Sequence, residues 1–171
     1  FVEGDSEHLF LSDWGANRLF DLRHDPPRDY AELLGLDLRD HEGQLLYGWG
    51  SLVDDYDRDG KDDLFLTQGM IYDPIGEGFN AHRDVVLLQR QERFISLSEE
   101  AGISSHNHQD SGHSRRLYSS RGAAKADLDH DGFLDLITVP MEGVIRLHGE
   151  VPTTQEVPRR CTLIPRNSLI P

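Results

Sequence analysis

Aspartates at alternating positions are the residues of this chain best suited to chemistry. They occur in two stretches, residues 55–64 and 127–136, which share the pattern D-x-D-x-D-G-x-x-D-L and start 72 residues apart (127 − 55). Carboxylates spaced in this way along a tight loop can converge on one point, where their mutual repulsion favours a bound cation. The pattern therefore predicts two oxygen-rich cation sites.

Calcium suits such a loop because it takes about six to eight oxygen ligands from carboxylates, carbonyls and water. Magnesium suits it less, since it retains several waters and uses few carboxylates. A solvated acidic turn is the alternative, because Asp and Gly are common in turns. The predicted ligands of the first calcium site are the side chains of Asp55, Asp57, Asp59 and Asp63 and the backbone carbonyl of Lys61. Those of the second site are the side chains of Asp127, Asp129, Asp131 and Asp135 and the backbone carbonyl of Phe133.

An EF-hand is the main alternative among calcium loops, and the sequence argues against it. An EF-hand requires a bidentate Glu at loop position twelve, where this chain has Leu66 in the first loop and Thr138 in the second. The residues after the loops, 64–67 and 136–139, are short apolar and β-branched runs without helical periodicity. We therefore expect each loop to connect two strands.

A second repeat lies in the segments that precede the two aspartate loops. Residues 17–36 and 84–103 align without gaps at an offset of 67 residues (84 − 17). Each segment has the pattern of a strand, a polar turn, another strand and a Glu-x-x-Gly-apolar connector. Together the repeats predict a unit of strand, calcium loop, strand, variable loop, strand, turn and strand. Four short strands in a repeating unit are typical of a β-propeller blade.

These motifs resemble FG-GAP/VCBS repeats, the family whose blades include those of the integrin alpha-chain propeller. Small residues lead into both loops, at 48–50 and 120–124, as in that family. Residues 94–103 are similar to the connector F-x-D-V-T-E-x-A-G-L of the ASPIC/UnbV subgroup, which includes the cartilage acidic proteins. The resemblance covers about residues 9–150 and has two departures: residues 2–8 lack spaced aspartates, and Asp62 stands where the family has an apolar residue.

The resemblance implies a seven-bladed β-propeller with calcium in its blade hairpins. We expect this chain to be all-β, a partial β-propeller of two to three four-stranded blades, and thus a fragment of the whole propeller, since propellers have about 4–8 blades. Trp14 and Trp49 are expected in the core or between blades. The predicted divisions are the later part of one blade (1–40), a complete blade with an inserted loop (41–118), the start of the next blade (119–150), and a Pro-rich tail or the start of a following β-module (151–171).

Composition limits the classes of partner. The net charge is −14, from 31 acidic and 17 basic residues; two calcium ions would bring it to about −10. This acidity argues against nucleic acid as a partner, because phosphate binding requires basic surface. No apolar run approaches the roughly 20 residues of a membrane span, and Cys161, as the single cysteine, excludes an intrachain disulfide. We expect the partners to be proteins or the remaining blades.

A histidine-rich stretch is the remaining candidate site. His106, His108 and His113 lie close in sequence and could bind zinc or copper. The surrounding Ser, Gly and Asp residues favour an exposed polar loop instead. Because loops on a rigid scaffold often carry function, these histidines with Arg115 and Arg116 are our candidate for a contact loop.

The expected function is binding rather than catalysis. The sequence contains no G-x-S-x-G, no G-x-G-x-x-G and no P-loop, so no catalytic residue is predicted. The resemblance implies a secreted or otherwise extracytoplasmic calcium-binding module for protein–protein interaction, adhesion or assembly. Two alternatives stay open: part of a propeller enzyme with structural calcium, and a structural subunit of a larger complex.

Overall fold

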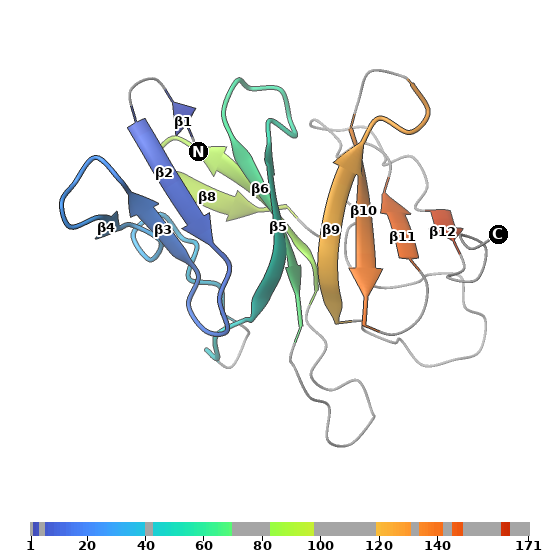
Figure 1. The fold of residues 1–171 in the computed structure, drawn as a ribbon, viewed down its shortest axis with the longest axis horizontal. Helices are drawn as coiled ribbons and strands as arrows, with labels where there is room; N and C mark the ends of the chain where they lie inside the picture. The colour runs from blue at the N-terminus through green and yellow to red at the C-terminus, as the bar shows by residue number, and fades with distance from the viewer. Residues whose placement is uncertain are drawn as a thin grey trace.

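The computed structural model describes residues 2–3, 6–39, 43–69, 83–97, 119–130, 134–141, 145–148 and 162–164. Within these ranges the fold is all-β, with twelve strands and no helix. The strands form three four-stranded sheets, and each sheet runs in chain order, so that neighbouring strands are antiparallel and consecutive in sequence (Figure 1). The predicted all-β fold is confirmed.

The three sheets follow one another along the chain. The first sheet contains β1 (Val2–Glu3), β2 (Ser6–Leu11), β3 (Arg18–Asp21) and β4 (Arg28–Asp29). The second contains β5 (Gly48–Asp54), β6 (Asp63–Gln68), β7 (Val85–Arg90) and β8 (Arg93–Ser96). The third contains β9 (Ser120–Ala126), β10 (Asp135–Pro140), β11 (Ile145–His148) and β12 (Thr162–Ile164). Each acidic loop connects the first two strands of its sheet.

The second sheet packs between the other two, and its central strands are buried on both faces. Along β6, Leu64 and Leu66 belong to a buried cluster that includes Leu19 of the first sheet. Phe65, between them, belongs to another cluster that includes Leu136 of the third sheet. Because successive side chains of a strand point to opposite faces, an uninterrupted apolar run fills both clusters. The neighbouring strand β7 shows the same alternation.

The second and third sheets approach most closely at their first strands, β5 and β9, which lie side by side (Figure 1). Gly50 of β5 lies so near β9 that a Cβ at this position would be 2.8 Å from the backbone nitrogen of Ala123. Its own N–H donates to the Thr67 hydroxyl of β6 at 2.8 Å. A small residue is therefore required in this part of β5, which gives a physical reason for the small residues before the loop.

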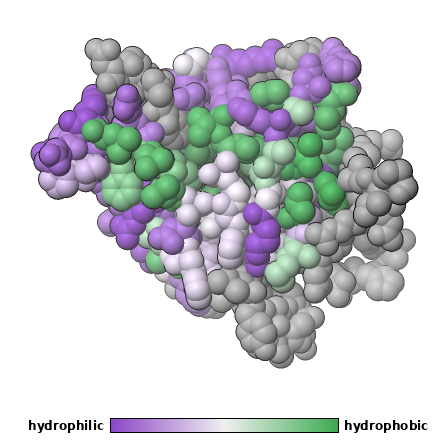
Figure 2. Space-filling model, in the orientation of Figure 1, coloured by the Kyte–Doolittle hydropathy of each residue, from purple (hydrophilic) through white to green (hydrophobic). Residues whose placement is uncertain are grey.

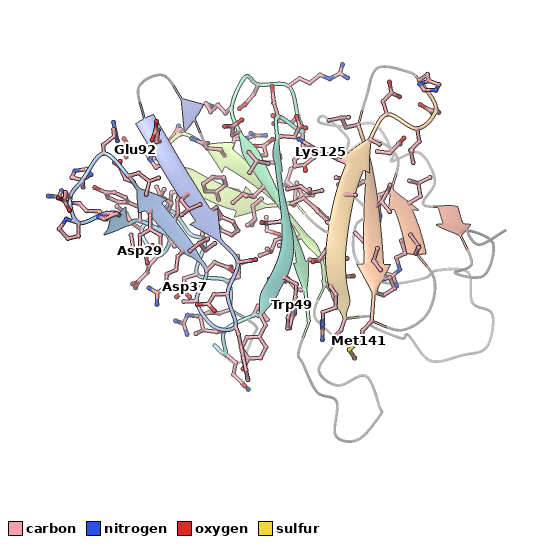
Figure 3. All side chains as sticks on the ribbon, viewed as in Figure 1. Asp29, Asp37, Trp49, Glu92, Lys125 and Met141 are labelled. Atoms are coloured by element: carbon pink, nitrogen blue, oxygen red, sulfur yellow. The ribbon has the colours of Figure 1, made fainter. Side chains whose placement is uncertain are left out.

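Polar contacts hold both ends of this strand pair. At the end near the β5–β6 loop, the Lys125 Nζ donates to the carbonyl of Val53 at 2.6 Å and pairs with Asp54. At the opposite end, the Arg121 guanidinium lies 4.3 Å from the centre of the Trp49 ring. Figure 3 labels Lys125 and Trp49 at these two ends. The prediction that Trp49 lies between sheets is confirmed.

Three features differ from the sequence-based expectations. Trp14 is 67% exposed and contacts Tyr47 edge-on, with ring centres 6.2 Å apart. The prediction of a core position for Trp14 was wrong, because this residue lies in the exposed β2–β3 connection, but its contact with Tyr47, which directly precedes β5, agrees with the alternative of a position between sheets. The first sheet begins at Val2, with a short strand that the motif pattern did not indicate. Finally, Thr162–Ile164 pairs with β11 as the fourth strand of the third sheet, whereas sequence placed it in a tail or a following module.

Candidate metal site

The β5–β6 loop is a tight turn between paired strand ends. Asp54 and Asp63 face each other as the last cross-strand pair of β5 and β6. Arg58 and Gly60 have positive φ angles of 61° and 86°, a region that glycine adopts without strain and other residues adopt rarely. The two left-handed residues curl the loop, so that its alternate side chains point to one side.

Three carboxylates converge within this curl. Oxygens of Asp55, Asp57 and Asp63 all lie within 4.8 Å of one another, an arrangement that could hold a metal ion. Asp63, at the start of β6, is fully buried, whereas Asp55 and Asp57 are half-buried. Three hard oxygen donors of this kind suit calcium, with carbonyls or water completing its coordination shell. The sequence pattern predicted all three.

Backbone N–H groups orient these carboxylates. The two oxygens of Asp55 accept hydrogen bonds from the N–H groups of Asp59 and Gly60, both at 3.0 Å. Asp63 accepts from the N–H of Tyr56 at 3.0 Å and, across the sheet, from the N–H of Gln89 at 2.8 Å. Because an ionised carboxylate offers about four lone-pair positions, these bonds leave acceptor capacity for a cation.

Asp59 differs from the other predicted ligands. One of its oxygens accepts from the backbone N–H of Lys61 at 3.0 Å, and the other pairs with the Lys61 Nζ at 3.1 Å and with Arg90 at 3.2 Å. The Arg90 guanidinium also pairs with Asp57. The structure thus brings three of the four predicted carboxylates together and turns the fourth toward basic side chains.

The electrostatics of the loop favour a bound cation. Burial raises the pKa of Asp63 to about 6, and the neighbouring carboxylates of Asp57 and Asp59 contribute to the increase. Hydrogen bonding to Lys61 instead lowers the pKa of Asp59. Ionisation of Asp63 is therefore costly in this setting, and a divalent cation beside it would remove that cost.

The second loop shares the backbone geometry of the first in the residues that are described. His130 has a φ of 62°, and it occupies the position of Arg58, whose φ is 61°. The N–H of Leu128 donates to Asp135 at 3.0 Å, the counterpart of the 3.0 Å bond from Tyr56 to Asp63. Three predicted members of this loop, Asp131, Gly132 and Phe133, lie outside the described residues. So does the histidine-rich contact loop, His106, His108, His113, Arg115 and Arg116.

A buried polar group between the second and third sheets was not foreseen. The Ser120 hydroxyl donates to Asp84 at 2.7 Å, and the N–H of Gln68 donates to the same carboxylate at 3.1 Å. Burial raises the pKa of Asp84 to about 6, and burial lowers the pKa of His148, on β11, to about 4. Because Ser120 is fully buried, this serine–aspartate pair does not present a nucleophile to a substrate.

Two of these contacts could not be predicted from the sequence. Arg90 is the last residue of β7, and only the pairing of β6 with β7 brings it to the loop. Asp84 resembles an ordinary residue at a strand start, and its partner Ser120 belongs to another sheet. The sequence offers one signal for these two residues: each is a charged residue at an end of the apolar strand β7.

Comparison with models of known protein families gives no match, and comparison with curated proteins gives none either. Within the described ranges, no helix has the length and hydropathy needed to span a membrane. Any functional conclusion for this chain therefore depends on the residues and their geometry.

Proposed function

We propose that the chain is a calcium-stabilised part of a β-propeller that serves as a protein-binding module outside the cytoplasm. The observation that carries the proposal is the convergence of Asp55, Asp57 and Asp63, whose oxygens lie within 4.8 Å of one another. Three consecutive four-stranded antiparallel sheets, each packed face to face on the next, support the propeller, since blades are arranged in this way.

Calcium has a structural role in this proposal. The first ion binds Asp55, Asp57 and Asp63, and the second binds the equivalent residues Asp127, Asp129 and Asp135. Each ion would neutralise the repulsion between carboxylates and fix the hairpin that connects the first two strands of a sheet. Fixed hairpins and sheets present the remaining loops to a partner. A protein partner suits the net charge of −14 better than nucleic acid does.

Calcium-dependent thermal stability tests the proposal directly. We expect saturating calcium to raise the melting temperature by about 5–10 °C, the shift that a ligand at 100 times its Kd gives a protein of this size. Asp57→Asn removes a predicted ligand and should abolish a large part of this shift. The measurement is differential scanning calorimetry in calcium and in EDTA, with titration calorimetry for the affinity.

Asp62→Asn is the matched control. It removes the same charge from the same loop, but Asp62 is not a member of the converging triad. We expect it to leave the calcium shift nearly intact. A wild-type melting temperature that does not respond to calcium would overturn the proposal, and equal losses in the two variants would indicate a general charge effect in place of a site.

A further inference from the structure

A groove lies between the first and the second sheet, next to the β7–β8 hairpin. It has a volume of about 1460 Å³, and its lining comes from two segments, the turn after β4 (within 30–35) and the β7–β8 hairpin (within 88–97). The two sheets that these segments follow or belong to pack on each other within this chain. The groove is therefore distinct from the outer faces of the first and third sheets.

Backbone contacts hold the two walls of the groove together. The N–H of Phe94 donates to the carbonyl of Leu34 at 2.8 Å, and the N–H of Leu34 donates to the carbonyl of Tyr30 at 3.0 Å. Gly35 has a φ of 81°, and a Cβ at this position would lie 3.3 Å from the carbonyl oxygen of Phe94. The turn thus lies directly against β8. The groove is part of the fold itself, as most binding sites are.

The lining of the groove includes two strongly exposed apolar side chains. Leu33 on one wall is 65% exposed and Ile95 on the other is 51% exposed, whereas Phe94 beside them is buried. Hydrophobic surface also lies over β2 (Figure 2), where Leu9 and Leu11 are 43% and 44% exposed. Leu33 and Ile95 differ from these by facing a shared groove, where one ligand could remove both from water.

The groove also carries a basic side chain that a ligand can reach. Three charged residues line it: Arg90, Glu92, which Figure 3 labels, and Arg93. Arg90 pairs with the aspartates of the β5–β6 loop. Arg93 is exposed and forms no ion pair with any residue in the described ranges. A guanidinium binds carboxylates in a bidentate geometry, so Arg93 suits an acidic group next to the apolar side chains.

We propose that this groove binds an apolar peptide segment of a partner protein that carries one or two carboxylates. Arg93 pairs with a carboxylate, while apolar side chains of the segment cover Leu33 and Ile95. The inference rests on the proposed function and names the contact surface and the chemistry of the partner. A peptide suits the groove better than a small molecule, whose pockets have about 300–1,000 Å³. More carboxylates would be unfavourable, because the net charge of −14 repels anions.

Selection from a display library of random twelve-residue peptides on the intact chain tests the proposal, followed by fluorescence anisotropy of single selected peptides. We expect peptides that combine Leu, Ile or Phe with Asp or Glu and that bind with a Kd of about 1–100 μM. Arg93→Glu and Ile95→Asp should each weaken this binding at least about tenfold. Both residues are exposed, so the melting temperature should stay the same, which shows that the loss is not caused by unfolding.

Arg28→Glu and Leu22→Asp are the matched controls. Both residues are exposed and neither lines the groove, so both variants should bind the peptides like wild type. Selected peptides that bind the groove variants and the controls equally would overturn the proposal, as would a selection that yields no binder or only basic peptides. Self-association of wild type that Ile95→Asp abolishes would also overturn it, because the occupant would then be a second copy.

Measurements in calcium and in EDTA separate this inference from the proposed calcium site. Binding that depends on Arg93 and Ile95 supports the groove even where calcium leaves the melting temperature unchanged, a result that overturns the calcium site alone. A normal calcium shift without such binding overturns the groove alone.

Discussion

Arg90 brings a positive charge to Asp57, one of the carboxylates that we propose to hold calcium. Its guanidinium contacts Asp57 and Asp59 from the end of β7. The Arg90 side chain is one-third exposed, so these pairs contribute modestly to stability, in the range of about 0–1 kcal/mol for exposed pairs. Their larger effect is on calcium, because a cation already near the site competes with an incoming ion.

We predict that Arg90→Met raises the affinity of the first site for calcium severalfold, while lowering the melting temperature slightly in EDTA. The affinity rises because the competing charge is lost, and the stability falls because the repulsion between Asp57 and Asp59 is no longer relieved. Titration calorimetry measures the affinity. Arg93→Met, at an exposed position of β8, is the control, and unchanged affinity in Arg90→Met would contradict the competition.

The sequence predicted the residues of this candidate site better than their arrangement. Alternate aspartates around a glycine were sufficient to identify Asp55, Asp57 and Asp63, because those positions depend on the local curl of the loop alone. The separation of Asp59 from them could not be predicted. It depends on Lys61, which binds both Asp59 oxygens from the same loop, and on Arg90, which reaches the loop through the pairing of β7 with β6.

At the scale of the strands, the close approach of β5 and β9 restricts the sequence at Gly50. We predict that Gly50→Ala destabilises the protein by about 1–3 kcal/mol, the usual cost of inserting a methyl group into a packed contact. The added Cβ would lie 2.8 Å from the backbone nitrogen of Ala123, so the two strands must separate. Urea unfolding measures the loss of stability.

Gly122→Ala is the corresponding control on β9. A Cβ at Gly122 would meet only the Cβ of Val139, at an ordinary 3.8 Å. This variant should have nearly wild-type stability, since the added methyl group finds room. Equal destabilisation in both variants would mean that the loss reflects a general effect of replacing glycine, and that the distance between the strands is not the cause.

The strands themselves were largely predictable. The apolar runs of β6 and β7 and the turn between β7 and β8 are local patterns, and the structure confirms them. The shortest strands, β1 with two residues and β12 with three, carry too few side chains for a periodic pattern. They pair with the edges of β2 and β11, and no local sequence pattern predicts such a pairing.

At the scale of the whole molecule, two buried groups give stability opposite responses to pH. Burial raises the pKa of Asp84 from 3.8 to about 6, so its favourable contribution is complete below pH 4 and is lost as the pH rises through 6. Burial lowers the pKa of His148 from 6.5 to about 4. Its contribution is complete above pH 6.5 and is lost as the pH falls toward 4. The two effects largely cancel in the wild type.

Single variants should therefore separate the two effects. Relative to Asp84→Asn, wild type should lose about 3 kcal/mol of stability between pH 4 and pH 7, since two pKa units correspond to that energy. Relative to His148→Gln, wild type should gain a similar amount over the same interval. Urea unfolding at several pH values measures both differences. The pKa of Asp63 is also raised, but Asp63 is present in wild type and in both variants, so its contribution drops out of each difference. Parallel curves for wild type and either variant would contradict the assignment.

The burial of β6 on both faces has a consequence for strand register. In a sheet with one wet face, a slip by one residue moves apolar side chains into water, which fixes the register. In β6 such a slip would only exchange Leu64 and Leu66 with Phe65, because both faces are apolar. Asp63 fixes the register of β6 instead, since its carboxylate accepts hydrogen bonds from the N–H groups of Tyr56 and Gln89 on either side. The residue at the candidate metal site thus also sets the alignment of the central sheet.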